Sequence, residues 1–256
     1  MKTRGIAAGL ALLLGAVLMT GCRAGETTIT YDNGDAYTAG GTSLAKAIDS
    51  VEIHWSAGSV LVMSGQYETI SFSEDGQDTE GKMALRYLVD GNRLVIWPCA
   101  SGTAVSQDDD KDLVVTVPGY ESLTGFSIDA GNAMVEVDDV DTAQLSVSNL
   151  TGTIRVETAS PNVGMDLTSV HGDVIAALSA LPAKLSISDT SGNVSLQIPE
   201  DSDATFDYTT TSGRFTSGMA SEQNGTLYTI GDGGTQYEVD TVSGDLTVVW
   251  QEDSEQ

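Results

Sequence analysis

The chain has 256 residues, and its 37 acidic side chains against 11 basic ones give a formal net charge of −26. That balance disfavours binding to nucleic acids and to anionic lipid headgroups, because both are recognised through basic patches. We therefore expect no nucleic-acid partner. The length allows one large domain or two small ones.

Residues 1–21 have the pattern of a lipoprotein signal peptide. A basic start precedes an apolar run that is too short to span a membrane comfortably. The segment Leu18–Cys22 resembles the cleavage box of bacterial lipoproteins, with Met19 where leucine is usual. We expect Cys22 to be lipidated and to anchor the protein to the bacterial cell membrane, facing outside the cytoplasm. Ordinary secretion or an uncleaved anchor is the alternative.

The sequence contains only two cysteines, Cys22 and Cys99. If Cys22 carries the lipid, Cys99 has no cysteine partner, so no intrachain disulfide stabilises the exported fold. We expect Cys99 to be a small buried apolar residue rather than a nucleophile. Stability must then come from side-chain packing and from the hydrogen bonds of strand ladders.

Composition divides the rest of the chain into four parts. They are a lipidated cysteine with a flexible tether (22–45), an irregular β-rich N-terminal part of the domain (46–121), a β-repeat region (122–251) and an acidic tail (252–256). Two tyrosines of the tether, Tyr31 and Tyr37, could instead dock on the domain, and the sequence does not decide between these alternatives.

The part from residue 46 to residue 121 contains short strand patterns and an acidic loop. Apolar and polar residues alternate around Ile53, and Asp90-Gly91 supplies the backbone freedom that a tight hairpin turn needs. Calcium requires six to eight oxygen ligands from converging groups. The loop offers a weak calcium site for which a solvated loop is the default interpretation, and we expect no cofactor. Its candidate ligands are Asp108, Asp109, Asp110 and Asp112.

Six segments of the second half share one pattern, a glycine followed by an alternating strand. Their glycines are separated by 21, 20, 20, 21 and 31 residues, which is a period of about 20 with one insertion. A fixed period of this size indicates a repeat architecture. An earlier glycine fits the same frame as a diverged repeat. The turn glycines are Gly58, Gly131, Gly152, Gly172, Gly192, Gly213 and Gly244.

The period and the alternation predict an all-β fold. Positions +2, +4 and +6 after each glycine are mainly apolar, as in a half-buried strand. A near-constant period favours a right-handed parallel β-solenoid with coils of about 20 residues, and an antiparallel β-sandwich of repeated hairpins is the alternative. Each glycine is expected to provide a positive φ at its turn. The residues that follow the glycines place no two aspartates side by side, as expected of a stacked column.

Catalytic motifs are missing from the sequence. It has no Gly-x-Ser-x-Gly elbow, phosphate loop, His-Glu-x-x-His pattern or cysteine metal pair. Of the two histidines, His54 falls on the polar side of its strand and His171 at a turn surface. Trp55 and Trp250 fall on the apolar sides of their strands, where core packing is expected rather than a sugar-stacking platform. We predict that the protein is not an enzyme.

The whole pattern resembles a known family. The residues that carry the resemblance are the segment Tyr31–Asn33 with Tyr37–Gly41, the strand turn around Ile53–Val60 and the Ser-Gly-Asp/Asn repeats. Over roughly residues 27–250 they are similar to the putative-adhesin, β-strand-repeat family of bacterial lipoproteins. The resemblance implies a β-solenoid and a surface location, and it provides no catalytic or binding residues.

These observations lead to one functional hypothesis and two alternatives. The first is a non-enzymatic, surface-anchored scaffold for adhesion or ligand binding, whose expected ligand is an extracellular protein or a glycan. The second is a structural or stress-sensing envelope component that acts through a membrane protein partner. The third is a module that depends on a bound cation.

Overall fold

The computed structural model describes residues 26–66, 68–76, 79–106, 109–119, 122–158 and 163–251. The expected signal peptide, Cys22, Asp108 and the acidic tail lie outside these residues. Within them, no helix combines the length and the apolar character that a membrane span requires.

The described residues fold almost entirely into strands, with one short 3-10 helix, η1 (Gly34–Ala36). The strands of the N-terminal half are β1 (Glu26–Ile29), β2 (Thr38–Ala39), β3 (Thr42–Leu44), β4 (Ser50–Gly65), β5 (Ile70–Gly76), β6 (Arg86–Asp90), β7 (Arg93–Trp97), β8 (Thr103–Ser106), β9 (Lys111–Pro118) and β10 (Gly125–Asp138). Those of the C-terminal half are β11 (Gln144–Thr151), β12 (Ile154–Thr158), β13 (Gly164–His171), β14 (Val174–Leu178), β15 (Lys184–Asp189), β16 (Val194–Ile198), β17 (Ala204–Thr210), β18 (Phe215–Ser217), β19 (Ser221–Asn224), β20 (Leu227–Ile230), β21 (Thr235–Thr241) and β22 (Leu246–Trp250).

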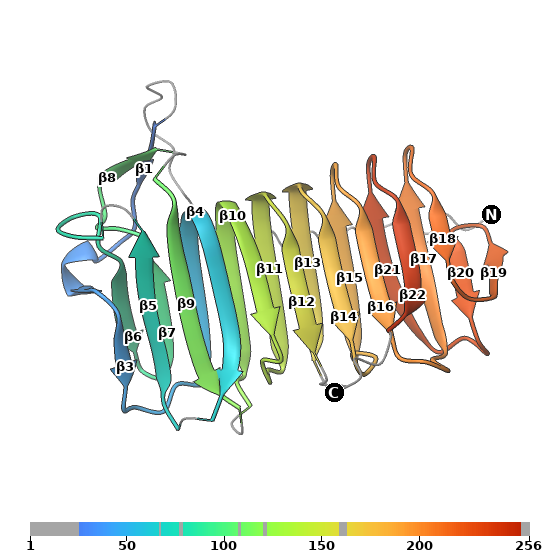
Figure 1. Cartoon of the computed structure of the whole chain (residues 1–256), viewed down its shortest axis with the longest axis horizontal. Coiled ribbons are helices and arrows are strands. Elements are labelled where there is room, and N and C mark those ends of the chain that lie inside the picture. The colour runs from blue at the N-terminus through green and yellow to red at the C-terminus, as the bar shows by residue number, and fades with distance from the viewer. Residues whose placement is uncertain are drawn as a thin grey trace, which may run out of the picture.

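Apart from β1 and β8, which pair with each other, the strands form one connected sheet with two faces, called here the first and the second sheet, which are joined through the long strands β4 and β10. The first sheet has the order β2-β6-β7-β4-β10-β11-β13-β15-β21-β17-β20-β19. The second has the order β3-β5-β9-β4-β10-β12-β14-β16-β22-β18. Figure 1 shows them as one long row of strands.

Each glycine-led repeat contributes one coil of this stack. Consecutive coils pair in parallel and in register, so that equivalent positions of the repeat align down the stack; Val174, for example, lies opposite both Ile154 and Val194. The expected all-β solenoid-like architecture is confirmed. The alternative, a sandwich of repeated hairpins, would pair neighbouring segments antiparallel, whereas the described repeats pair with one another in parallel.

The order of coils in space differs from their order in the chain. The coil made by β21 and β22 lies between the coil of β15 and β16 and that of β17 and β18 (Figure 1). This arrangement explains the long spacing between the last two glycines. The residues between them form β19 and β20, and the chain then returns past β17 to form β21. At the other end, β4 lies between β10 and the pair β7 and β9.

The residues that directly follow the turn glycines form a column down the stack, and this column follows the spatial order of the coils. It runs Asp173, Asn193, Asp245, Arg214, and each backbone N–H is bonded to the side chain before it, at 2.8 Å for Asn193, 3.2 Å for Asp245 and 2.8 Å for Arg214. No aspartate in these four positions has an aspartate as its neighbour. The expected separation of like charges is therefore confirmed, although two coils have exchanged places.

Residues 26–44 are not the flexible tether that the sequence suggested. β1 pairs with β8, β2 with β6 and β3 with β5. Tyr31 stacks on Trp97 with ring centroids 4.5 Å apart, and its hydroxyl donates to the Cys99 carbonyl at 2.9 Å. The alternative of docking is the one observed, because these aromatic and backbone contacts offset the cost of ordering the segment.

The apolar positions of the repeats fill one continuous core between the two sheets. Val135, Ile154, Val174, Val194 and Leu246 are each fully buried. Burial of one such side chain contributes about 1.5–3 kcal/mol. At the C-terminal end of the stack the pattern changes, because Phe215 and Met219 are only partly buried against the core.

A buried polar column lines the turn between the two sheets. Asn149, Ser169, Asp189 and Thr241 align in register. Asn149, Ser169 and Thr241 each donate a side-chain hydrogen bond to the carbonyl of the glycine three residues later, at 3.0, 3.0 and 2.9 Å. An ionised aspartate cannot donate such a bond. Burial raises the pKa of the Asp189 carboxyl above its usual 3.8, and both carboxyl oxygens are buried without a hydrogen-bond partner among the described residues.

Replacing Asp189 with asparagine is therefore expected to stabilise the protein at neutral pH. The raised pKa favours the protonated acid in the folded state, so stability falls as pH rises above 3.8 and the loss is complete above the folded-state pKa. Asp189→Asn should increase the free energy of unfolding at pH 7 by about 1 kcal/mol or more, since the amide can donate to the Gly192 carbonyl. Below pH 3.8 the gain should disappear.

Urea unfolding at about pH 3.5, 5 and 7, on either side of the usual carboxyl pKa, measures this effect. The matched reverse variant is Asn149→Asp, which should be destabilised at neutral pH and less so at low pH. If both substitutions changed the free energy of unfolding by the same amount at every pH, the ionisation of an aspartate in this column could not be the cause.

Candidate functional site

The seven turn glycines lie where neighbouring coils come closest together. A Cβ added at Gly172, Gly192, Gly213 or Gly244 would lie under 3.0 Å from the carbonyl oxygen of the glycine in the adjacent coil. Gly131 would meet the Ser56 carbonyl at 2.5 Å. Close approach is thus the physical reason for these glycines.

The expected positive φ holds for only some of them. Gly58 and Gly152 have φ of 98° and 110°, and Gly172 lies at the edge of the extended region at 159°. Gly131, Gly192, Gly213 and Gly244 do not have a positive φ. The prediction of a uniform positive-φ turn was therefore wrong.

The acidic loop before β9 does not gather its described carboxylates. Asp109 accepts the Ser106 N–H at 2.6 Å, and Asp112 accepts the Ser59 hydroxyl at 2.6 Å on the outer side of β9. Asp110 is exposed beside them. No group of three or more His, Cys, Asp or Glu side chains suited to a metal ion occurs among the residues that the structure describes. Calcium binding here stays a prediction.

The histidines sit in different surroundings. His54 Nε2 lies 2.7 Å from Glu52 and its ring stacks on Trp97 with centroids 3.8 Å apart. His171 Nδ1 lies 2.6 Å from the Ser191 hydroxyl, on the exposed turn of the next coil. That hydroxyl also lies 3.1 Å from the Val170 carbonyl, to which it donates. The Ser191 hydroxyl thus has two neighbours on an exposed turn, the imidazole and a backbone carbonyl.

Cys99 is buried, as expected, in a small cluster with Ile29 and Val105. Burial raises the pKa of its thiol to about 11, although the nearby Lys111 acts in the opposite direction. A thiol with this pKa is almost entirely protonated at neutral pH and is a poor nucleophile. Trp55 is buried and donates its ring N–H to the Lys111 carbonyl at 2.9 Å.

Lys111 and Glu74 form a buried ion pair that the sequence analysis did not identify. The Lys111 ammonium lies 2.6 Å from Glu74, with side chains only 2% and 6% exposed. It also donates to the carbonyls of Met83 at 2.6 Å and Pro98 at 2.5 Å. Glu74 accepts the Leu85 N–H at 2.7 Å. The pair joins β5 and β9 to the two loops beside them.

The outer face of the first sheet is a polar surface built from aligned columns. We call it the polar face, and it spans the coils from β10 to β17. One column contains Asp129, Ser148, Thr168, Ser188, Asp240 and Thr209, and the next contains Ser127, Ser146, Asp166, Ser186, Glu238 and Asp207. The rise between coils is about 4.8 Å. Hydroxyl and carboxylate groups thus recur at regular intervals on a packed support.

The outer face of the second sheet is less uniform. Met134 is 52% exposed and Val114 is 36% exposed, and Arg155 lies 3.8 Å from Glu157 in the same sheet. Apolar and charged residues are mixed over most of this face, and its aligned hydroxyl groups, Ser195, Thr247 and Thr216, lie at the C-terminal end of the stack. It provides an internal reference for tests of the polar face.

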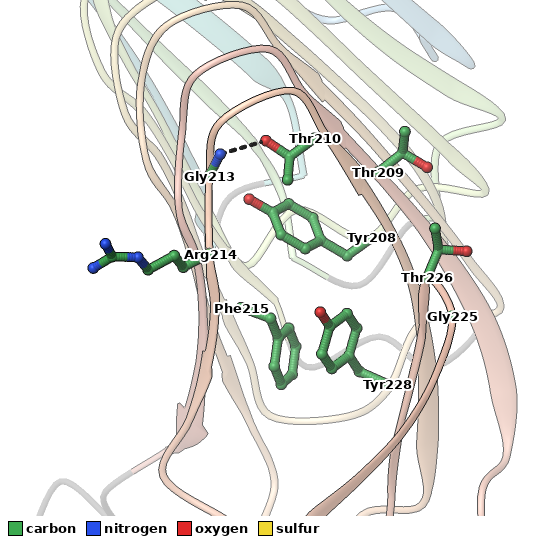
Figure 2. A pocket seen from close by; sticks show the side chains of 9 residues that line it. All are labelled: Tyr208, Thr209, Thr210, Gly213, Arg214, Phe215, Gly225, Thr226 and Tyr228. Carbon is green, nitrogen blue, oxygen red and sulfur yellow. Dashed lines mark hydrogen bonds between the residues drawn. The ribbon is translucent and has the colours of Figure 1, made fainter.

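A cavity of about 490 Å³ opens at the C-terminal end of the stack. Figure 2 shows Tyr208, Phe215 and Tyr228 gathered inside the last coil, with Arg214 directed away from them. The rings of Phe215 and Tyr228 are stacked with centroids 4.0 Å apart. The Tyr208 hydroxyl donates to the Gly244 carbonyl at 2.5 Å, so it is held in place. The cavity is where the continuous core of the stack meets solvent.

A family model described as Toastrack DUF4097 matches residues 45–249. A solved structure of a putative cell adhesion protein from Clostridium sporogenes is 12% identical, with a TM-score of 0.49, and the match covers 84% of this chain and 100% of that one. A putative adhesin from Bacteroides fragilis is 11% identical, with a TM-score of 0.32, covering 82% and 96%. Comparison with curated proteins gives no match.

Proposed function

The chain belongs to the Toastrack DUF4097 family, and from this premise we propose that it is a non-enzymatic surface scaffold that binds an extracellular protein or glycan through its polar face. The observation that carries the proposal is the register of the polar face, where Ser148, Thr168 and Ser188 stand side by side on successive coils. Repeat stacks offer extended surfaces of this kind for binding. Lipidation at Cys22 would hold that surface outside the cytoplasm.

The chemistry of the polar face favours a neutral or basic polar ligand. Its hydroxyls donate and accept hydrogen bonds, and its carboxylates accept them. The charge of −26 opposes acidic ligands at long range. The two solved structures described as adhesins are consistent with an adhesive role but are too dissimilar to carry the argument.

Three lysines on the polar face are expected to weaken ligand binding strongly. The variant Ser148→Lys/Thr168→Lys/Ser188→Lys should bind any ligand found in a screen of matrix proteins, glycans and cell-wall polymers at least about tenfold more weakly, because it removes three hydroxyl groups and its long side chains cover their neighbours. Surface plasmon resonance with the purified protein measures the change.

The matched control places three lysines on an aligned column of the outer face of the second sheet, as Ser195→Lys/Thr247→Lys/Thr216→Lys. Both variants change the net charge equally, so a loss of ligand binding in the first variant alone supports binding through the polar face. Equal binding by the two variants, or no ligand in the screen, would count against the proposal. Crosslinking in cells that captured only a membrane protein would favour the sensing alternative instead.

A further inference from the structure

Three of the four sheet ends are finished by antiparallel strands in the described part of the chain. At the N-terminal end, β6 and β2 complete the first sheet, and β5 and β3 complete the second. At the C-terminal end, β20 and β19 complete the first sheet. The second sheet ends at β18, which among the described strands pairs only with β22. Each of these four end strands has one edge without a partner among the described strands, but β18 is the one that pairs in parallel, in the register of the repeats.

The hydrogen-bonding groups of this edge can be assigned from the ladder. The Arg214 carbonyl accepts the Leu246 N–H, and the Gly218 N–H donates to the Val248 carbonyl, both at 2.9 Å. Alternate residues of a strand bond to opposite sides. The backbone groups of Phe215 and Ser217 consequently point away from β22, toward the open edge. Such groups are a template for pairing with another strand.

The end cavity lies beside the same edge. The stacked rings of Phe215 and Tyr228 and the ring of Tyr208 line it (Figure 2). In the preceding coils, the inward side chain after the turn is covered by its counterpart in the next coil, as Leu246 is by Phe215. At the last coil the ring of Tyr228 is stacked on Phe215 in place of such a counterpart, and the cavity lies beside these two rings. An apolar side chain of an added strand could enter it and pack against both rings.

Charge indicates which residue should precede that apolar side chain. In the column after the glycines, Asp245 accepts the N–H of Arg214, and the column then stops at Arg214, which is exposed. The ion pairs found among the described residues involve other basic side chains. An acidic residue on the added strand would be the neighbour of Arg214.

We propose that β18 and the end cavity form a docking site for an extended segment of a partner protein, which adds to the second sheet parallel to β18 and carries an acidic residue followed by an apolar one. The acidic residue pairs with Arg214 and the apolar residue fills the cavity against Phe215 and Tyr228. Main-chain bonds then give affinity and the two side chains give specificity. This site is separate from the polar face.

A peptide with the sequence of Gly244–Trp250 is the probe, because in the protein this segment already pairs with the other side of β18 in the required register. Fluorescence anisotropy of the labelled, end-capped peptide with the purified protein, at about 0.15 M salt to screen the net charge, should give saturable binding. Arg214→Glu should weaken it about tenfold or more, and the Asp245→Lys version of the peptide should recover binding to that variant.

Two further variants complete the test. Ser217→Pro removes an edge N–H without removing a bond to β22 and should weaken binding about tenfold or more. Arg155→Glu, on the outer face of the same sheet, is the matched control and should bind as well as the unchanged protein. If Ser217→Pro fails to fold, the charge exchange at Arg214 still decides the question. No saturable binding, equal binding by Arg214→Glu, or a dimer of the protein that occupies β18 would overturn the proposal.

Discussion

Replacing Lys111 with methionine is expected to lower the free energy of unfolding by about 3–5 kcal/mol, the usual cost of removing one partner of a buried ion pair. Methionine leaves the Glu74 carboxylate buried, with the Leu85 N–H at 2.7 Å as its remaining bond. It also removes the donors to the carbonyls of Met83 and Pro98. The strands β5 and β9 would lose their link to both neighbouring loops.

The double variant Lys111→Met/Glu74→Leu separates charge from packing. Replacing both partners with apolar side chains is often neutral or stabilising, so the double variant should be markedly more stable than Lys111→Met. Lys184→Met is the exposed control, because its pair with Asp166 is 61% and 41% exposed, and it should change stability by less than about 1 kcal/mol. Urea unfolding measures all three. If the double variant were the least stable of the three, the instability of Lys111→Met could not be attributed to an unpaired buried carboxylate at Glu74.

The second large effect is expected at the column of close-packed glycines. Gly192→Ala places a Cβ under 3.0 Å from the carbonyl of Gly172 and at 2.9 Å from the Asp189 carboxyl. The contact with the carbonyl cannot be relieved by rotating a side chain, because it would require the turn of the adjacent coil to move. We expect a loss of about 3 kcal/mol, the upper part of the range for overpacked sites.

Gly125→Ala is the matched control. A Cβ there meets nothing within 4 Å, and its φ is not positive. Thermal unfolding followed by circular dichroism should show a large drop in the melting temperature for Gly192→Ala and almost none for Gly125→Ala. Similar melting temperatures for the two variants would contradict close approach as the reason for the glycine column.

The alternation of apolar residues was sufficient to predict the core of the stack. Ile154, Val174, Val194 and Leu246 are buried because the two-residue period of a strand places them on one face. The same period contained a signal for the ion pair. Lys111 is in phase with Leu113, Val115 and Val117, and Glu74 is in phase with Ile70 and Phe72, so both charges could have been recognised as inward-facing.

Other features depend on contacts that a single sequence does not reveal. The glycines look alike in the sequence, whether the backbone needs a positive φ, as at Gly58, or only close approach, as at Gly244. The exchange of coil order could not be derived, because β17 and β21 have equally suitable faces for β15. The docking of Tyr31 depends on the partner Trp97, which lies far along the chain.

The exchanged order of the coils has a consequence for the time at which this end of the molecule can form. During synthesis, β17 and β18 emerge before β21 and β22, yet they pair in parallel only with those later strands among the described ones. The earlier coil therefore cannot take its final place on the stack until the later one has been made and lies between it and β15 and β16. A ribosome stalled after β20 would hold a chain in which the final neighbours of β15 and β16, and of β17 and β18, have not yet been made.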